Sequence, residues 1–170
     1  MEYTRKVQQI AEMSRVQKIF QHPTFQTALK KNRDAEADRI FCRHNIDHLL
    51  DTARLAYIFS LERGYDLPKD LVYAAALLHD IGRWRQYEDG TPHDLAGSQL
   101  AAPILEEVGF NAQECQCVLN AILEHRSTTQ GDHLTEVLYD GDKASRCCFL
   151  CPVQDACNWS TEKKNLQLTW

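Results

Sequence analysis

The chain has 170 residues, of which 44% are hydrophobic and 25% are charged, and its formal net charge is −5. This length is typical of one domain with a substantial core. The acidic balance, with no block of basic residues, argues against nucleic-acid binding and membrane-surface binding. The longest wholly apolar run, Leu71–Leu78, is too short to cross a bilayer. No apolar signal core follows the first residues, and seven cysteines are an odd number for a secreted disulfide scaffold, so we expect a cytoplasmic protein.

Hydrophobic periodicity predicts helices in every segment where a pattern is clear, and therefore an all-α fold. In the first part of the chain we expect helices over residues 5–20, 24–31 and about 35–63. His22-Pro23 separates the first two, and Gly64 fits the end of the third. The third helix is expected to be amphipathic, with Ile40 and Phe41 among its inward-facing residues.

Start and stop signals continue this pattern in the second part of the chain. Further helices are expected from Pro68 to about Gly82, from Thr91-Pro92, from Asn111 and over residues 134–148. Pro103 should kink or split the helix that contains it. Asn111 with Glu114 three residues later resembles a capping box. Strand-like alternation and hairpin signals between apolar runs are missing.

Side chains of the type that bind divalent metal ions occur in three separate helical segments. His79-Asp80 is preceded by His44-x3-His48 and followed by Asp142. Adjacent His and Asp side chains cannot both face one way on an ideal helix, so the pair is expected at a helix end. A metal held by such a set supplies charge and makes hydroxide from water near neutral pH, which suits hydrolysis.

This ordered set, H…HD…D, resembles the HD-domain superfamily of metal-dependent phosphohydrolases. The resemblance covers roughly residues 40–146. Residues 75–83, Ala-Ala-Leu-Leu-His-Asp-Ile-Gly-Arg, look like the family's LLHDIGK, and Tyr139-Asp-Gly-Asp142-Lys143 looks like its Y-x-A-D-K. The resemblance implies a compact, single-domain helical bundle of the HD type. We expect an N-terminal helical extension over 1–38 that packs on the core, a metal-binding core over 39–146, and a cysteine-containing tail over 147–170.

The first ligand is either His44 or His48. The stretch His44–Thr52 looks like the H-x3-H-x3-V pattern of cyclic-nucleotide phosphodiesterases, in which the second histidine binds metal and the first acts as general acid. The resemblance therefore assigns His48 to metal and His44 to proton transfer, with both rings on one helical face. The alternative is that His44 is the ligand, or a surface histidine.

Two more histidines extend the set to a dinuclear site. His93 and His125 are similar in position to second-metal ligands of dinuclear HD subfamilies, such as diadenosine tetraphosphate hydrolases of the YqeK type and HD-GYP phosphodiesterases. His22 and His133 lie outside the pattern and are interpreted as surface histidines. The resemblance implies one or two Fe, Mn or Zn ions, with Asp80 bridging two of them, on a ligand set made of His48, His79, Asp80, His93, His125 and Asp142.

Basic residues near the motifs are candidates to bind a substrate phosphate. Arg83 and Lys143 are the main candidates and Arg126 a weaker one, although the first two could equally pair with site carboxylates or lie on the surface. The predicted catalytic residues are thus His44, Asp80, Arg83 and Lys143.

The predicted reaction is attack of metal-bound hydroxide on a nucleotide or another small phosphoester or phosphoanhydride. Two alternatives remain: a mixed-valent diiron oxygenase of the HD type, and a noncatalytic metal- or redox-sensing binding module. No membrane or nucleic-acid partner is expected, and a homo-oligomer is compatible with the sequence.

The tail holds four of the seven cysteines within eleven residues. Cys148-x2-Cys151 is a spacing used for zinc and for iron–sulfur clusters, and Cys157 could be a third ligand. The fourth could be Cys147, or Cys42 if the fold brings it close. The tail therefore holds a second metal centre, with Zn or a [4Fe-4S] cluster, or else a set of reduced thiols. Cys115 and Cys117 are interpreted as ordinary thiols.

Overall fold

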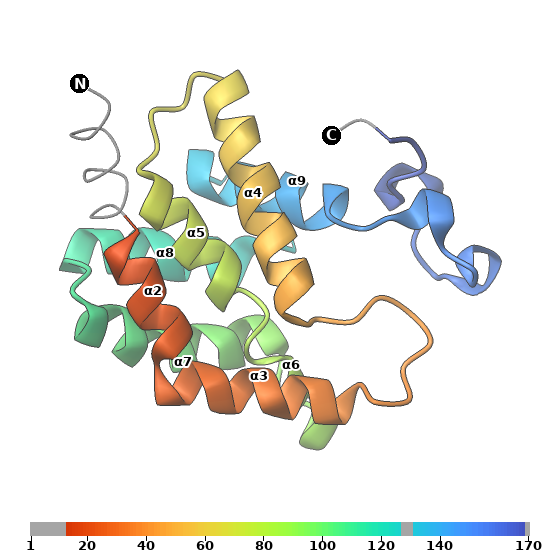
Figure 1. The fold of residues 1–170 in the computed structure, drawn as a ribbon, viewed down its shortest axis with the longest axis horizontal. Coiled ribbons are helices and arrows are strands. Elements are labelled where there is room, and N and C mark those ends of the chain that lie inside the picture. The colour runs from red at the N-terminus through yellow and green to blue at the C-terminus, as the bar shows by residue number, and fades with distance from the viewer. Residues whose placement is uncertain (1–12, 127–130, 169–170) are drawn as a thin grey trace.

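The computed structural model describes residues 13–126 and 131–168, and it is all-α, as predicted. Figure 1 shows the helices gathered into one bundle, with the C-terminal segment at its side. Within the described ranges there are α-helices and short 3₁₀ turns but no strand. The α-helices are α2 Ser14–Gln21, α3 Pro23–Ala35, α4 Ile46–Glu62, α5 Lys69–Leu78, α6 Arg83–Glu88, α7 His93–Val108, α8 Ala112–Glu124 and α9 His133–Ala144.

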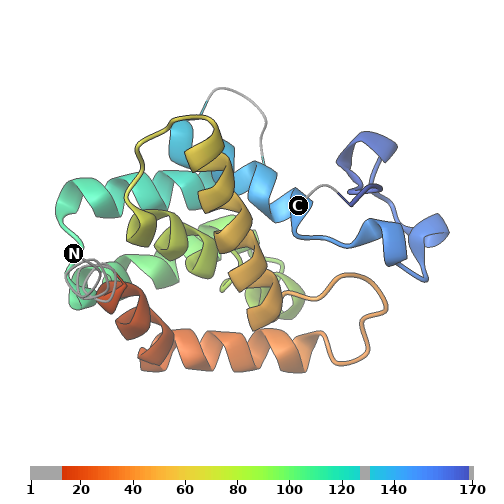
Figure 2. The same cartoon turned by 45° about the horizontal axis from the view of Figure 1, so that its top comes forward.

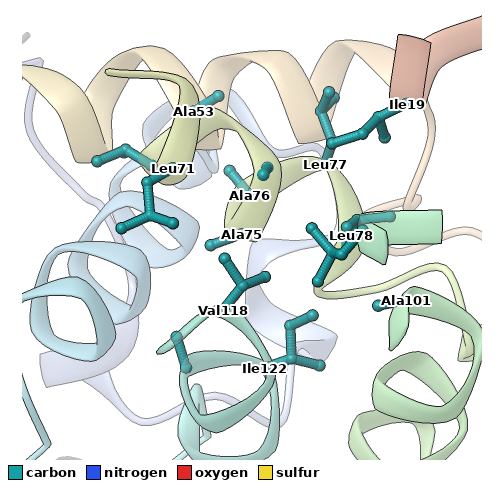
Figure 3. Packing of buried hydrophobic residues seen from close by; sticks show 14 of the residues in the cluster. Ile19, Ala53, Leu71, Ala75, Ala76, Leu77, Leu78, Ala101, Val118 and Ile122 are labelled. Atoms are coloured by element: carbon teal, nitrogen blue, oxygen red, sulfur yellow. The ribbon is translucent and has the colours of Figure 1, made fainter. Parts of the chain in front are cut away.

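Helix α5 is the centre of the core. It contacts α2, α4, α7, α8 and α9, and every residue from Ala74 to Leu78 is buried. Figure 3 shows Leu77 beside Ile19 of α2, and Ala75 facing Val118 of α8. The alanines have small side chains, so neighbouring helices approach α5 closely on several faces. The apolar run Leu71–Leu78 is thus a core helix, and its C-terminal end lies inside the bundle.

Helix α2 packs on α5, and α3 follows it along the same side of the bundle. Figure 2 shows them, in red and orange, running across one side of the bundle. Arg15 of α2 donates hydrogen bonds to Asp70 of α5 (2.7 Å) and to Glu114 of α8 (2.8 Å), and α3 contacts α6 and α7. Of the predicted first helix, residues 14–21 are helical and residues 5–12 lie outside the described residues.

The prediction of one helix over 35–63 was wrong in its first turns. Helix α3 ends at Ala35 and α4 begins at Ile46, with Asn45 as its N-cap, so residues 36–45 form a loop. The side chain of Glu36 accepts a hydrogen bond from the backbone N–H of His44 (2.7 Å), which folds the loop back on itself. Ile40 is 67% exposed instead of inward-facing, because it lies on this loop.

Three other boundaries also differ from the predictions. Helix α5 ends at Leu78, and a turn over 79–82 precedes α6, which confirms that His79-Asp80 lies at a helix end. Helix α7 continues through Pro103 without splitting; this proline is exposed, so water can replace the lost hydrogen bond. Helix α9 ends at Ala144, not 148, and Ser145 bonds back to the carbonyl of Asp142 (2.8 Å). The capping box at Asn111 is confirmed.

Hydropathy adds one finding about membranes. In the part of the chain that the structure describes, no helix combines the length and the apolar character needed to cross a bilayer.

Two glycines allow the close packing that positions the site. A Cβ on Gly82, in the turn after His79-Asp80, would lie 2.6 Å from the carbonyl oxygen of His93 at the start of α7. A Cβ on Gly141 of α9 would lie 2.9 Å from the carbonyl oxygen of Thr52 in α4. Neither position has room for a methyl group. These contacts bring the His79-Asp80 turn against α7, and Asp142 against α4.

We predict that Gly82→Ala lowers the free energy of unfolding by roughly 1–3 kcal/mol or more, because the methyl group must push against backbone atoms of α7. Urea denaturation followed by circular dichroism measures this change. The control is Gln99→Ala, which changes an exposed residue of α7. Its free energy of unfolding should stay within about 0.5 kcal/mol of the parent value. Equal stability of both variants would contradict the close packing at Gly82.

Candidate metal centre

The structure brings all six predicted ligands together in two adjoining groups. One group contains His48, His79, Asp80 and Asp142, and the other contains Asp80, His93 and His125. In each group the ligand atoms lie within 4.8 Å of one another, and every residue is buried. The ligands come from α4, the end of α5, the start of α7, the end of α8, and α9. Segments far apart in the sequence thus converge on one buried point.

Asp80 lies between the two groups. Its Oδ2 is 3.1 Å from Nε2 of His79 and 3.6 Å from Nε2 of His48. Its Oδ1 is 3.4 Å from Nε2 of His93 and 3.9 Å from Nε2 of His125. Each carboxylate oxygen therefore faces a different pair of histidines, which is the arrangement that a bridging carboxylate requires.

Backbone carbonyls fix the orientation of two of these histidines. His79 donates from Nδ1 to the carbonyl of Ala76 (2.7 Å), and His125 donates from Nδ1 to the carbonyl of Ile122 (2.6 Å). A carbonyl oxygen only accepts, so the hydrogen is on Nδ1 in both rings. When either ring is neutral, its lone pair is on Nε2, the atom that points at Asp80. A second hydrogen bond of this kind is the usual support of a metal-binding histidine.

Side chains orient the other two histidines. Ser145 donates its hydroxyl proton to the carbonyl of Asp142, so it accepts from Nδ1 of His48 (3.0 Å). Nδ1 of His93 is 2.6 Å from Oε1 of Gln86 and 3.1 Å from a guanidinium nitrogen of Arg83. We assign its hydrogen to the shorter contact, with Gln86. All four histidines then present Nε2 to the carboxylates.

This donor set fits a divalent metal. Nε2 of His79 and Oδ1 of Asp80 are buried and have no hydrogen-bond partner, although buried polar atoms normally have one. Imidazole nitrogens and carboxylate oxygens are ligands of Fe, Mn and Zn alike. A cation in each ligand group would satisfy both atoms, one beside Nε2 of His79 and the other beside Oδ1 of Asp80.

The charges of the site shift its pKa values in opposite directions. Burial alone would raise the pKa of Asp80 and lower that of His79, but each holds the other in its charged form. The pKa of His79 therefore rises to about 9, and that of Asp80 falls well below its usual range. Burial lowers the pKa of His93 to about 3. In the metal-free chain, a proton on His79 takes the place of a cation.

His44 lies outside both ligand groups. It precedes the N-cap of α4, so the predicted placement of His44 and His48 on one helical face was wrong. Its Nδ1 is 2.5 Å from Oε1 of Glu36, and its Nε2 is 2.9 Å from the guanidinium of Arg83. Burial lowers the pKa of His44 to about 4. This placement favours His48 as the ligand and leaves His44 beside the site.

The predicted basic residues occupy three different places. Arg83 lines a pocket beside the ligand groups. The ammonium group of Lys143 pairs with the carboxylate of Asp142 and lies outside that pocket's lining. Arg126 is exposed. His133 is exposed, and His22 is half-buried, with Nε2 3.0 Å from Glu107.

Several residues of the site were missed by the sequence analysis, among them Glu36, which bonds to His44, and also Arg146 and Asn32. Arg146 is buried, and its guanidinium lies 2.8 Å from Nε2 of His48 and donates to the carbonyl of Arg43 (2.8 Å). Its position four residues after Asp142 was the only available signal. Asn32 of α3 donates to the carbonyl of Asp80 (2.9 Å) and accepts from the backbone of Trp84 (2.8 Å). It holds the turn after α5, and nothing in the sequence marks it.

The pocket beside the ligand groups has a volume of about 360 Å³. Its walls come from the loop 36–45, from Arg83 and from the tail, with Phe41 and Trp159 as aromatic members. No acidic residue lines it, whereas four basic residues do: Arg39, Arg83, Arg146 and Lys164. A pocket with this lining suits an anion.

The tail cysteines are divided by this pocket. Cys148, Cys151 and Cys157 line it together with Cys42, whereas Cys147 is exposed and lines a different hollow beside Phe149. Cys115 is buried and Cys117 is half-buried in α8. The structure thus separates Cys147 from the three other tail cysteines with which it was grouped.

Comparison with known proteins gives the following matches. The model of the HD domain family matches residues 45–158. An uncharacterized protein of Clostridium beijerinckii is 40% identical over 82% of this chain and 88% of its own length. Ribonuclease Y 1 of Pediococcus pentosaceus is 32% identical over 55% of this chain, which spans only 16% of that protein. The crystal structure of a predicted HD superfamily hydrolase from an uncultured Thermotogales bacterium is similar, with 25% identity, a TM-score of 0.59, and coverage of 83% of this chain and 81% of that one.

We predict that metal binding weakens as the pH falls below about 9, because a metal can take Nε2 of His79 only after its proton leaves. Near pH 7, uptake should release about one proton, and affinity should fall roughly tenfold per pH unit. Titration calorimetry with Mn²⁺ in buffers of different ionisation enthalpy measures both quantities. His133→Ala is the control and should behave like the parent. Affinity independent of pH between 6 and 8 would contradict the assignment.

Proposed function

The chain belongs to the HD-domain family, and from this premise we propose that it is a metal-dependent phosphohydrolase. Its substrate would be a nucleotide or another small compound with a phosphoester or phosphoanhydride bond. The observation that carries the proposal is the position of the six buried ligands beside a pocket lined by arginines. Neither feature alone identifies the reaction, but together they fit hydrolysis of a phosphate group.

The six residues would hold two divalent ions, with His48, His79 and Asp142 on one side of Asp80, and His93 and His125 on the other. Ions bound there would polarise a phosphoryl oxygen and lower the pKa of a water molecule to near neutrality. The histidine Nδ1 bonds keep each Nε2 directed at this point, so the chain needs little rearrangement to accept the ions.

Arg83 and Arg146 are placed to bind the phosphate and to stabilise the charge that develops on its oxygens. Both line the pocket, and both approach the ligand groups: Arg83 Nε lies 3.8 Å from Asp80 Oδ1, and Arg146 Nη2 lies 3.9 Å from Asp142 Oδ1. A guanidinium can bind two phosphate oxygens as a fork. Lys143, which pairs with Asp142, would instead reduce the negative charge of the ligand set.

His44 and Glu36 form the proton-transfer pair of the proposal. Burial would raise the pKa of Glu36, but its hydrogen bonds with His44 bring it to about 2, so Glu36 is anionic. It fixes Nδ1 of His44 and stabilises the positive charge that the imidazole takes up with a second proton. Nε2 faces Arg83, where a bound phosphate would lie. In the free chain His44 is neutral, and Arg83 donates to its Nε2. A phosphate bound by Arg83 would take over that hydrogen bond and place negative charge beside Nε2, so that His44 would accept the proton released by the attacking water and pass it to the leaving oxygen.

The pocket favours a small substrate over a long polymer. The name of Ribonuclease Y indicates RNA as the substrate of that protein, but this chain spans only 16% of it. The net charge of −5 is unfavourable for a long polyanion, whereas the basic side chains are gathered around a pocket of about 360 Å³. Phe41 and Trp159 in its walls could stack on a nucleobase.

We predict phosphate or nucleotide release that requires Mn²⁺, Fe²⁺ or Zn²⁺ when the chain is incubated with nucleoside phosphates, cyclic nucleotides, dinucleoside polyphosphates and short RNA. Asp80→Ala should lower kcat by at least about a hundredfold, because it removes a ligand shared by both ions. Phosphorus NMR or chromatography measures the products. His133→Ala is the control. A fully active Asp80→Ala variant, or turnover that consumes oxygen without hydrolysis, would contradict the proposal.

For Arg146→Ala we predict a 10- to 100-fold rise in KM and in the inhibition constant of inorganic phosphate, since a charge-assisted hydrogen bond contributes about 1.5–3 kcal/mol. Steady-state kinetics measures both constants. Arg126→Ala, which changes an exposed arginine outside the pocket, should leave both unchanged. Arg146→Lys keeps the charge without the fork and should lie between the two. An unchanged phosphate inhibition constant in Arg146→Ala would exclude this arginine from phosphate binding.

A further inference from the structure

The tail after α9 has almost no core of its own. Within residues 147–168, the regular elements are three short 3₁₀ turns, Cys148–Leu150, Gln154–Ala156 and Thr161–Lys163. Over residues 147–168 the only buried residue is Cys148, while Leu150 and Leu168 are 76% and 77% exposed. So small an apolar core cannot hold a segment of this length in one conformation, and segments of this kind are usually stabilised by disulfides or a metal.

Four thiols gather where the tail meets the loop 36–45. Cys148, Cys151 and Cys157 of the tail and Cys42 of the loop all line the pocket described above. Figures 1 and 2 both show the loop, in orange, and the tail, in blue, on the same side of the bundle. All four cysteines are free, and none is fully exposed. Two segments separated by about a hundred residues thus contribute thiols to one place.

The local geometry around Cys148 suits a chelating pair. Cys148 and Cys151 are the ends of one 3₁₀ turn, in which the backbone N–H of Cys151 donates to the carbonyl of Cys148 (3.2 Å). This tight turn is the C-x2-C arrangement with which two thiolates bind one metal. Burial raises the pKa of the Cys148 thiol, and the neighbouring Cys42, Cys157 and Cys151 raise it further. The three other thiols are therefore close enough to interact with Cys148 by charge.

From this arrangement we infer that Cys42, Cys148, Cys151 and Cys157 form a tetrathiolate site for a soft metal centre, either Zn²⁺ or an iron–sulfur cluster. The centre would join the tail to the loop 36–45 and so build one wall of the pocket. Cys147 is not a member, because it is exposed and lies at a different hollow. Among the described residues, only His and Asp ligand atoms are grouped within 4.8 Å, so metal binding must draw the thiols closer together.

The chemistry of the four thiols is distinct from that of the His/Asp site. Thiolates bind zinc and iron–sulfur clusters strongly, whereas imidazole and carboxylate also accept Mn²⁺. A cation among the four would offset the mutual repulsion of their thiolates, and Arg39 and Arg146 in the same pocket lining add positive charge. The inference does not depend on the proposed hydrolysis, since it concerns other residues and another class of ligand.

The experiment uses the full chain, purified without oxygen or chelator, and measures metals, acid-labile sulfide and the absorption spectrum. Zinc that is present in the parent chain without sulfide, and that Cys42→Ser loses, identifies the zinc form, because the His/Asp site can also hold zinc. Iron with sulfide and visible absorption identifies the cluster form. After metal removal, Co²⁺ is added, because the sulfur-to-cobalt charge-transfer band reports thiolates and ignores the His/Asp site. Cys42→Ser should lose most of that band and about one metal centre per chain. Cys147→Ser, the same change at the neighbouring cysteine that lies outside the pocket, should keep both.

Alkylation of the unmodified chain gives a second measurement that does not depend on the folding of a variant. With metal bound, Cys147 should react quickly, while Cys42, Cys148, Cys151 and Cys157 should react at least about tenfold more slowly until a chelator is added. Mass spectrometry of peptides identifies each thiol. The inference is overturned if the four thiols react like Cys147 before chelation, if no cobalt–thiolate band forms, if Cys147→Ser loses the centre, or if the cysteines are joined as disulfides.

Discussion

Two buried carboxylates, Asp80 and Asp142, are the constraint on which the rest of this structure depends. A carboxylate removed from water is destabilised by several kcal/mol unless opposite charge or hydrogen bonds compensate it. Here compensation comes from His79, which is held in its charged form, and from Lys143 and Arg83 nearby. These groups do not satisfy every atom, because Oδ1 of Asp80 stays without a hydrogen bond. The buried site is therefore left with negative charge that a bound cation would compensate.

The packing of the helices brings the other ligands to these carboxylates. Helix α5 is apolar on nearly every face, so it is buried, and its end carries His79-Asp80 into the middle of the bundle. The other helices then present their ligands at matching points, and the close packing at Gly82 and Gly141 sets the distances. Asn32 fixes the turn from a helix that contributes no ligand. Core packing and site geometry thus depend on the same contacts, because those that fill the core also align the ligand atoms.

The ligand set could be predicted from sequence because metal binding restricts both residue type and order, and few unrelated chains would combine these histidines and aspartates. The loop 36–45 could not be predicted, because Ile40 and Phe41 continue a helical pattern. The hydrogen bonds of Glu36 with His44, eight residues later, fold this segment into a loop instead. Arg146 was missed for a similar reason. An arginine near a helix end is usually on the surface, and only the packing of α9 against α4 shows that this one is buried beside His48. The sequence thus indicates which residues can bind metal, but it does not show which distant segments contact one another.

The loop 36–45 lies between the His/Asp ligands and the cysteine-containing tail. Glu36 and His44 lie at its ends, where Glu36 bonds to His44 and Nε2 of His44 lies 3.8 Å from Oδ2 of Asp80. Arg39 and Cys42, between them, line the pocket together with the tail. Cys42 is only two residues from His44, so whatever fixes that thiol also restricts the imidazole. A tail bound through its cysteines would then do more than close the pocket. It would hold the loop in the conformation in which Glu36 orients His44. The position of His44 beside the His/Asp ligands would then depend on whether the tail, which has almost no core, is ordered.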